Sequence, residues 1–150
     1  MRAVLQRVKN ASVVVSGETV GAIGPGILIL LGVEASDTAE DSAWLAQKVA
    51  GLRLFNDESG AWNRSVIEAG GDVLVVSQFT LFASTKKGTK PSWYRAAKPD
   101  FAEPMCAQFV ADLARLLPRP AQTGRFGAMM DVSLVNDGPV TLILDTKQRE

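Results

Sequence analysis

Four consecutive residues near the middle of the chain combine groups that can act on a ligand. Ser77, Gln78, Phe79 and Thr80 directly follow the apolar run 73–76. Where a buried strand ends, hydroxyls, a carboxamide and newly released backbone N–H groups can point at a ligand, which is the geometry of an oxyanion hole. An ordinary polar turn has the same composition and is the commoner reason for it, so both interpretations stay open.

A second candidate is the pair Gly138-Pro139, which stands between two β-like runs. Proline has no amide hydrogen for a strand ladder, and the bond before proline becomes cis more readily than other peptide bonds. The four residues 136–139, Asn-Asp-Gly-Pro, also suit a hairpin turn between strands predicted at 128–135 and 140–144. The pair is therefore a plain turn or a functional loop.

A third candidate is the stretch 123–130, "TGRFGAMM". Gly124 and Gly127 allow the backbone to approach a ligand closely, and Met129 or Met130 can press against a flat ring. A loop that leads into a strand explains the same residues equally well.

The composition excludes several kinds of chemistry. The chain has no histidine, which removes Ser-His-Asp and Cys-His catalysis and histidine-bound zinc. Its carboxylates show no recognisable ligand spacing and its glycines form no phosphate loop, so we expect no metal and no cofactor. The single cysteine, Cys106, lies in an apolar helical pattern and is expected to pack as a small hydrophobe.

Charge and hydropathy give expectations about partners and location. Sixteen basic and sixteen acidic residues balance, so no overall field attracts nucleic acid or membrane. No apolar run is long enough to cross a bilayer and no secretory pattern is present, so we expect a cytoplasmic protein. The segment between Ser84 and Pro99 is locally unbalanced, with five basic residues, no acidic one, and Trp93 and Tyr94. A patch that binds a nucleic-acid backbone has this composition, although a solvated loop is the commoner case.

The elements that must position these residues are mostly strands. The apolar patterns predict strands at 1–8, 12–15, 19–23, 27–33 and 72–76, besides the two near the C-terminus. The run 27–33 is apolar on both faces, which predicts a covering layer on each side. Helical spacing predicts one helix from an Asp37 N-cap to about Ala50 and another from about Asp100 to Pro118. We therefore expect one α+β domain, residues 1–150, with a largely antiparallel sheet or barrel and two main helices.

Taken together, these stretches resemble the D-aminoacyl-tRNA deacylase family. "SQFTL" at 77–81 and "NDGPVT" at 136–141 are similar to the two signature motifs of the family and stand in the expected order. The start "MRAVLQRV" and the segments "GGDVLVVSQFTLFASTKKG" and "GRFGAMM" also fit the family pattern, so the resemblance spans the chain. It implies hydrolysis of the ester that joins a D-amino acid to tRNA.

The resemblance also implies a homodimer whose active sites lie at the subunit interface. Gly138-Pro139 would be cis, reach into the pocket of the partner and reject L-aminoacyl groups by collision, while glycyl-tRNA would be admitted. We assign the oxyanion donors to backbone N–H groups near Phe79 and Thr80, with Ser77 and Gln78 shaping the site. The vicinal ribose hydroxyl of the substrate would supply the missing chemistry, which leaves Thr80 to position groups; a nucleophilic Thr80 is the alternative.

Contacts with the rest of the substrate follow from the same resemblance. Phe79 and Met129 would form the slot for the terminal adenine, and Lys86, Lys87 and Lys90 would contact tRNA phosphates, with no DNA and no membrane as partner. A non-catalytic module that binds RNA 3′ ends or amino-acid-like ligands is the alternative function. An amidase for D-peptides ranks last, because an amide has a poorer leaving group.

Overall fold

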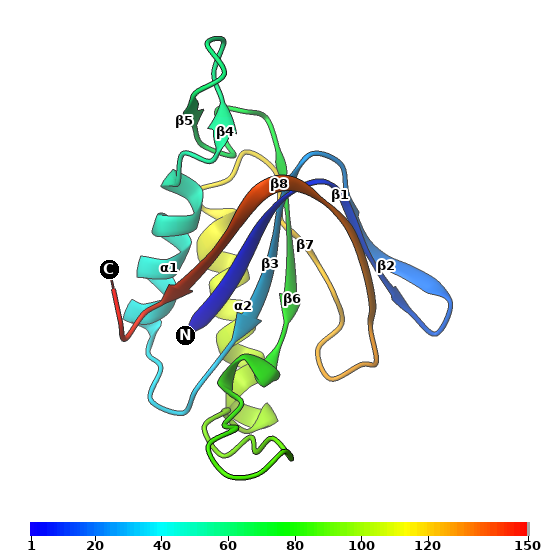
Figure 1. The fold of residues 1–150 in the computed structure, drawn as a ribbon, viewed down its shortest axis with the longest axis vertical. Helices are drawn as coiled ribbons and strands as arrows, with labels where there is room; N and C mark the ends of the chain where they lie inside the picture. The colour runs from blue at the N-terminus through cyan, green and yellow to red at the C-terminus, as the bar shows by residue number, and fades with distance from the viewer. Residues whose placement is uncertain (150) are drawn as a thin grey trace.

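The longest strands organise a sheet that is strongly curled. In the computed structural model, which describes residues 1–149, β1 (Arg2–Val15) pairs with β3 (Gly26–Gly32) through its first half and with β2 (Glu18–Ile23) through its second. β8 (Asp131–Asp145) runs antiparallel along the other edge of β1, as Figure 1 shows. Beyond β3 the sheet continues to β6 (Asp72–Ser77) and β7 (Gln122–Thr123), and both of these pairs are parallel.

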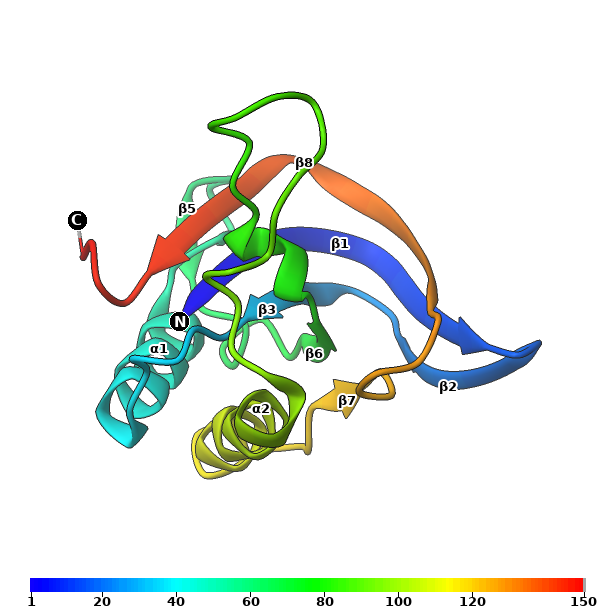
Figure 2. The same cartoon turned by 90° about the horizontal axis from the view of Figure 1, so that it is seen from below.

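The curl brings the two ends of the sheet together, so the strands form a nearly closed barrel (Figure 2). β2 approaches β6 and β7 although it pairs with neither in the sheet order. A Cβ atom at Gly21 of β2 would lie only 2.5 Å from the Thr123 carbonyl oxygen of β7. Glycine is therefore what permits this close approach.

Two helices lie side by side across one face of the sheet (Figure 2): α1 (Ala39–Gly51) and α2 (Pro99–Ala114). Alternate residues of the central strands, such as Ile29 and Val75, are buried against the helices in the larger apolar cluster. Their neighbours Leu28 and Leu74 belong to a second cluster with β1 and β2. The prediction that 27–33 is covered on both faces is confirmed. The helices cover one face, and the curled part of the sheet with β1 and β2 covers the other.

The helices and the segment between them differ in detail from the expectation. The N-cap of α1 is Thr38, which forms a capping box with Asp41, whereas the carboxylate of Asp37 pairs with the buried N-terminal ammonium of Met1. α2 begins one residue before the predicted start and ends before Pro118, at Ala114. The region between α1 and β6 forms a small hairpin of β4 (Phe55–Asn56) and β5 (Trp62–Arg64).

The two predicted C-terminal strands form one strand, so the expectation of a hairpin turn between them was wrong. Both halves of β8 pair with β1 in the same direction, as the pairs Val8↔Asn136 and Gln6↔Thr141 show. Five residue steps of β8 thus face two steps of β1, and residues 137–140 bulge from the ladder. Proline is tolerated here because a bulge needs no ladder hydrogen bond from it.

The predicted α+β class with two main helices is confirmed. The sheet is mixed, because β3–β6 and β6–β7 are parallel while β1 makes only antiparallel pairs. No helix within residues 1–149 has the length and apolar character needed to cross a membrane.

Candidate functional site

The turn after β6 carries the four residues of the first candidate. Ser77 ends β6, and after Gln78 the short 3-10 helix η1 (Phe79–Phe82) begins. The Gln78 N–H donates to the Leu31 carbonyl at 2.7 Å, which fixes the start of the turn to the end of β3. Phe79 and Thr80 are the first residues of η1, and the first N–H groups of a helix have no partner within it. The Phe79 and Thr80 N–H groups are therefore not bonded within η1.

A cavity of about 380 Å³ lies beside this turn. Its wall includes Ser77, Gln78 and Phe79 together with Trp93, Lys98 and Phe126. The Phe79 and Trp93 rings meet edge to face with centroids 5.4 Å apart, and Phe79 is 55% exposed. An apolar cavity with aromatic walls and a few polar groups at one edge suits a flat ring carrying a polar substituent.

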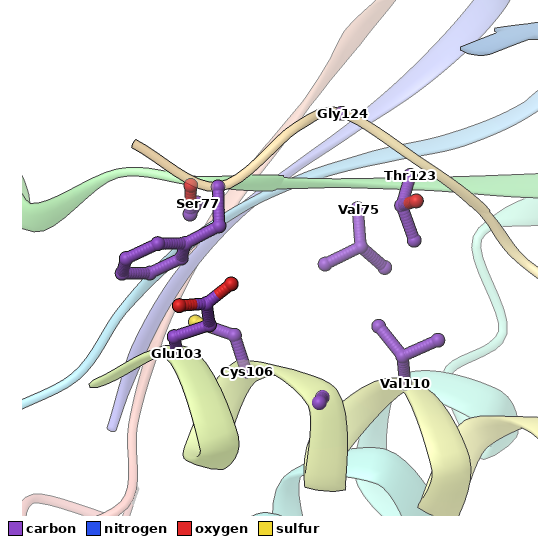
Figure 3. A pocket seen from close by; sticks show the side chains of 9 residues that line it. Val75, Ser77, Glu103, Cys106, Val110, Thr123 and Gly124 are labelled. Carbon is purple, nitrogen blue, oxygen red and sulfur yellow. The ribbon is translucent and has the colours of Figure 1, made fainter. Parts of the chain in front are cut away.

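A second cavity, of about 290 Å³, adjoins the first between α2 and the β6–β7 edge (Figure 3). Ser77, Cys106 and Phe126 line both cavities, and the Glu103 carboxylate points from α2 toward Ser77. Burial raises the pKa of the Cys106 thiol to about 11, and the charge of Glu103 adds to this rise. The thiol is thus protonated near neutral pH and is a poor nucleophile.

Arg2 fixes the far end of η1. Its Nη1 donates to the Leu81 carbonyl at 2.8 Å, while Nε and Nη2 donate to Asp145 Oδ2 at 3.0 and 2.8 Å. The guanidinium also lies 4.8 Å from the ring centroid of buried Phe82. Burial alone would raise the pKa of Asp145, but hydrogen bonds from the Lys147 N–H and from Arg2 hold it below its ordinary value. Arg2 therefore has an ionised partner at neutral pH.

The Gly138–Pro139 peptide bond is cis, as the resemblance implies. Both residues are exposed on the bulge of β8. The bulge is held by Arg7, whose Nε donates to the Asp137 carbonyl at 3.1 Å, and by Asn136, whose Nδ2 donates to the Arg7 carbonyl at 2.9 Å. The backbone at Gly138 is thus presented on a fixed loop.

Within one chain the two motifs do not meet. The register places Gly138–Pro139 beside Arg7, whereas η1 lies beside Arg2. Five residues of extended strand separate Arg2 from Arg7, a distance of about 17 Å. A site that uses both motifs cannot be assembled from one copy with this geometry.

Gly124 of the third candidate lines the second cavity and Gly127 lines the first, whereas the remaining predicted residues lie apart from both. Met129 is 92% exposed and lines neither cavity, so its place in an adenine slot stays a prediction. Met130 packs inward, where its sulfur would lie 2.6 Å from a Cβ at Gly124. Lys86, Lys87 and Lys90 are exposed on the loop between η1 and α2.

Sequence reasoning missed two kinds of cavity residue. Phe126 stands between the two glycines of the third candidate, but an isolated aromatic residue in a loop gave no sign that it would line both cavities. Glu103 and Cys106 come from α2, whose predicted role was packing. Among residues 1–149, no group of three or more His, Cys, Asp and Glu side chains is placed to hold a metal ion.

The fold and the site together define an α+β protein with a histidine-free, aromatic-walled cavity at the ends of two parallel strands. The family model described as D-Tyr-tRNA(Tyr) deacylase matches residues 4–145. Proteins named D-aminoacyl-tRNA deacylase from Opitutus terrae and Parabacteroides distasonis are 59% and 55% identical over 150 residues, covering the whole of each chain. The chain belongs to the D-Tyr-tRNA(Tyr) deacylase family.

Solved structures agree with this fold. The chain is similar to the c-Myc DNA Unwinding Element Binding Protein, with a TM-score of 0.91 and 43% identity over 97% of this chain and 98% of that one. It also resembles the structure described as "a probable eukaryotic D-amino acid tRNA deacylase", with a TM-score of 0.81 over 95% and 97% of the two chains. At 16% identity, that second likeness supports the fold alone.

Proposed function

We propose that this protein hydrolyses the ester bond of D-aminoacyl-tRNA and releases free amino acid and tRNA. The observation that carries the proposal is the turn 77–80, whose first three residues line an aromatic-walled cavity in a member of this family. The relatives that share the whole chain at 51–59% identity carry the name of this activity. For a protein that acts on charged tRNA we expect a cytoplasmic location.

The reaction needs little besides polarisation of the ester carbonyl and placement of a water molecule beside it. The Phe79 and Thr80 N–H groups would stabilise negative charge on the carbonyl oxygen while water adds to the carbonyl carbon. The bond from that carbon to the ribose oxygen then breaks, and the ribose oxygen takes up a proton. An aminoacyl ester has a good leaving group, and the neighbouring ribose hydroxyl can assist, so no imidazole is required.

The selectivity for D-amino acids would come from a second copy of the chain. Since Gly138–Pro139 lies beside Arg7 and the turn lies beside Arg2, five residues away along β1, a homodimer would supply the pair to the cavity of the partner. The exposed apolar side chains of the edge strand β8, Val135 and Ile143, support such an interface. The Gly138–Pro139 backbone would accept hydrogen bonds from the substrate ammonium and occupy the space that an L side chain needs. L-aminoacyl groups are then rejected by collision.

Steric exclusion of this kind cannot reject a glycyl group, because glycine has only a hydrogen atom where an L-amino acid carries its side chain. The decisive experiment measures release of amino acid from D-tyrosyl-, L-tyrosyl- and glycyl-tRNA at matched concentrations. We expect cleavage of the first and third and survival of the second. Cleavage of D-tyrosyl-tRNA with intact glycyl-tRNA would contradict steric exclusion. Protection of the ester in all three would indicate the non-catalytic binding module instead.

Thr80 positions groups in this proposal and does not attack the ester. Its Oγ1 accepts a hydrogen bond from Gln78 Nε2, and an amide cannot act as the base that a threonine nucleophile needs. We expect Thr80→Ala to lower kcat by about tenfold, the value of one lost hydrogen bond, because both backbone donors remain. Single-turnover kinetics with the purified variant checks this. Complete loss of turnover with substrate binding retained would make Thr80 the nucleophile.

The lysines of the loop between η1 and α2 are expected to contact tRNA phosphates. Replacing Lys86, Lys87 and Lys90 together by alanine should weaken tRNA binding and reduce the slope of log affinity against log salt by about 2, as expected for three contacts to single-stranded phosphates. Lys48→Ala removes an exposed lysine on α1 and serves as the control. Binding titrations at several salt concentrations measure the slope, and an unchanged slope in the triple variant would rule out these contacts.

A further inference from the structure

Arg7 is a buried charged residue whose guanidinium is enclosed from several sides. It is 6% exposed, and its Nε lies 3.1 Å from the Asp137 carbonyl oxygen and 3.2 Å from Asp137 Oδ2. Nη1 donates to the Leu54 carbonyl. The guanidinium carbon also lies 5.4 Å from the ring centroid of Trp62. The residue that holds the Gly138–Pro139 loop is thus itself held by the β4–β5 hairpin.

The hairpin is a firm support for the Trp62 indole. Trp62 pairs with Asn56 across the two short strands. The Asp57 carboxylate accepts hydrogen bonds from Ser59 N–H at 2.8 Å, Ala61 N–H at 3.1 Å and Asn63 Nδ2 at 2.7 Å. The turn that carries Trp62 is therefore cross-linked by one carboxylate. Trp62 remains 46% exposed, so about half of its side chain faces solvent while its ring lies against Arg7.

We propose that Trp62 is a positioning residue for selectivity. Its indole holds the Arg7 guanidinium in the orientation that fixes the Asp137 carbonyl, and so fixes the backbone at Gly138 next to it. A cation over an indole is attracted to the ring, and the ring also shields the Arg7–Asp137 hydrogen bonds from water. The inference rests on the proposed function, in which the Gly138–Pro139 loop distinguishes D from L substrates.

The test compares kcat/KM for D-tyrosyl- and L-tyrosyl-tRNA in Trp62→Ala and the unaltered protein. We expect the D/L ratio to fall by about tenfold, the scale of a partly desolvated cation–π contact. The melting temperature should change little, because the indole is half exposed. Trp62→Phe keeps a ring over Arg7 and should restore most of the ratio.

Trp44→Ala is the matched control. Trp44 also has a guanidinium over its ring, that of Arg149 at 4.5 Å, but it lies on α1 and not at the bulge of β8. Its loss should leave the D/L ratio unchanged. An equal fall in Trp44→Ala, or a Trp62→Phe variant as impaired as Trp62→Ala, would overturn the proposal.

Amide hydrogen exchange tests the contact between Trp62 and Arg7 without a substrate. The amides of residues 136–138 and 140 should exchange about tenfold faster in Trp62→Ala than in the unaltered protein, and those of α1 at the same rate. Unaltered exchange would overturn the role of Trp62 whatever the kinetics show. If the unaltered protein cleaved D and L esters equally, the proposed selectivity would be refuted. Faster exchange in Trp62→Ala would still show, in that case, that Trp62 stabilises the Gly138–Pro139 loop through Arg7.

Discussion

Gly138→Ala is expected to lower kcat/KM for D-tyrosyl-tRNA by about 100-fold while the protein stays folded. In the proposed dimer the backbone at Gly138 stands against the α-carbon of the substrate, where an added methyl group would displace the reacting ester by an ångström or more. A displacement of that size costs about two orders of magnitude in rate. Steady-state kinetics on D-tyrosyl- and glycyl-tRNA measures the loss.

The chain itself has room for this methyl group, so a loss of activity cannot be blamed on misfolding. The first atom that a Cβ at Gly138 would meet is Asn136 Oδ1 at 3.4 Å, an ordinary contact. Gly24→Ala is the control, because a Cβ there meets nothing within 4 Å and its φ is not positive. Full activity of Gly138→Ala would mean that this backbone does not face the substrate.

The elements that were predicted correctly are those whose signal lies in the local pattern. The apolar run 27–31, extended by Val33, predicted a strand covered on both faces, and Ile29 and Leu28 are buried in the two separate clusters. Helical spacing located both helices to within a few residues. Local hydrophobic periodicity reports burial, and burial is what fixes these elements.

The features that were missed depend on contacts between distant segments. Nothing near residue 136 reveals that both halves of β8 pair with the same strand, and only that shared partner turns the expected hairpin into a bulge. The same applies to Arg7, which looks like a routine polar residue of an alternating strand until Asp137, Leu54 and Trp62 surround it. A buried cation can be placed only when its partners are known.

The candidate site likewise contains residues that a local pattern predicted and residues that only distant contacts bring together. Ser77, Gln78 and Phe79 were predicted because polar residues abruptly follow an apolar strand, and all three line one cavity. The opposite wall comes from residues near 93–106 and from Phe126, more than a dozen positions away in sequence. A single sequence contains no signal that joins these segments.

Arg2→Ala is expected to reduce kcat by about 100-fold with a much smaller effect on KM. Arg2 holds the Leu81 carbonyl at the end of η1, and Gln78 holds its beginning through the Leu31 carbonyl. Without Arg2, the far end of η1 loses the hydrogen bond to the Leu81 carbonyl and is held only by the packing of buried Phe82. Oxyanion donors must be held in place before the reaction, and the loss of one donor costs 100-fold or more. Binding of the base and phosphates does not depend on this alignment, so KM should change little.

Two further variants separate alignment from simple destabilisation. Arg2→Lys keeps the charge beside Asp145, but one ammonium cannot replace a guanidinium that bonds Asp145 and the Leu81 carbonyl at once, so only part of kcat should return. Arg95 also lies over Phe82, at 5.5 Å, but the structure shows no bond from it to η1, so Arg95→Ala should keep kcat within about threefold. The kcat values of Arg2→Ala, Arg2→Lys and Arg95→Ala are compared at a temperature well below the melting temperature of each variant. A lower melting temperature of Arg2→Ala with unchanged kcat would show that Arg2 only stabilises the fold, because misplaced donors must slow the chemical step.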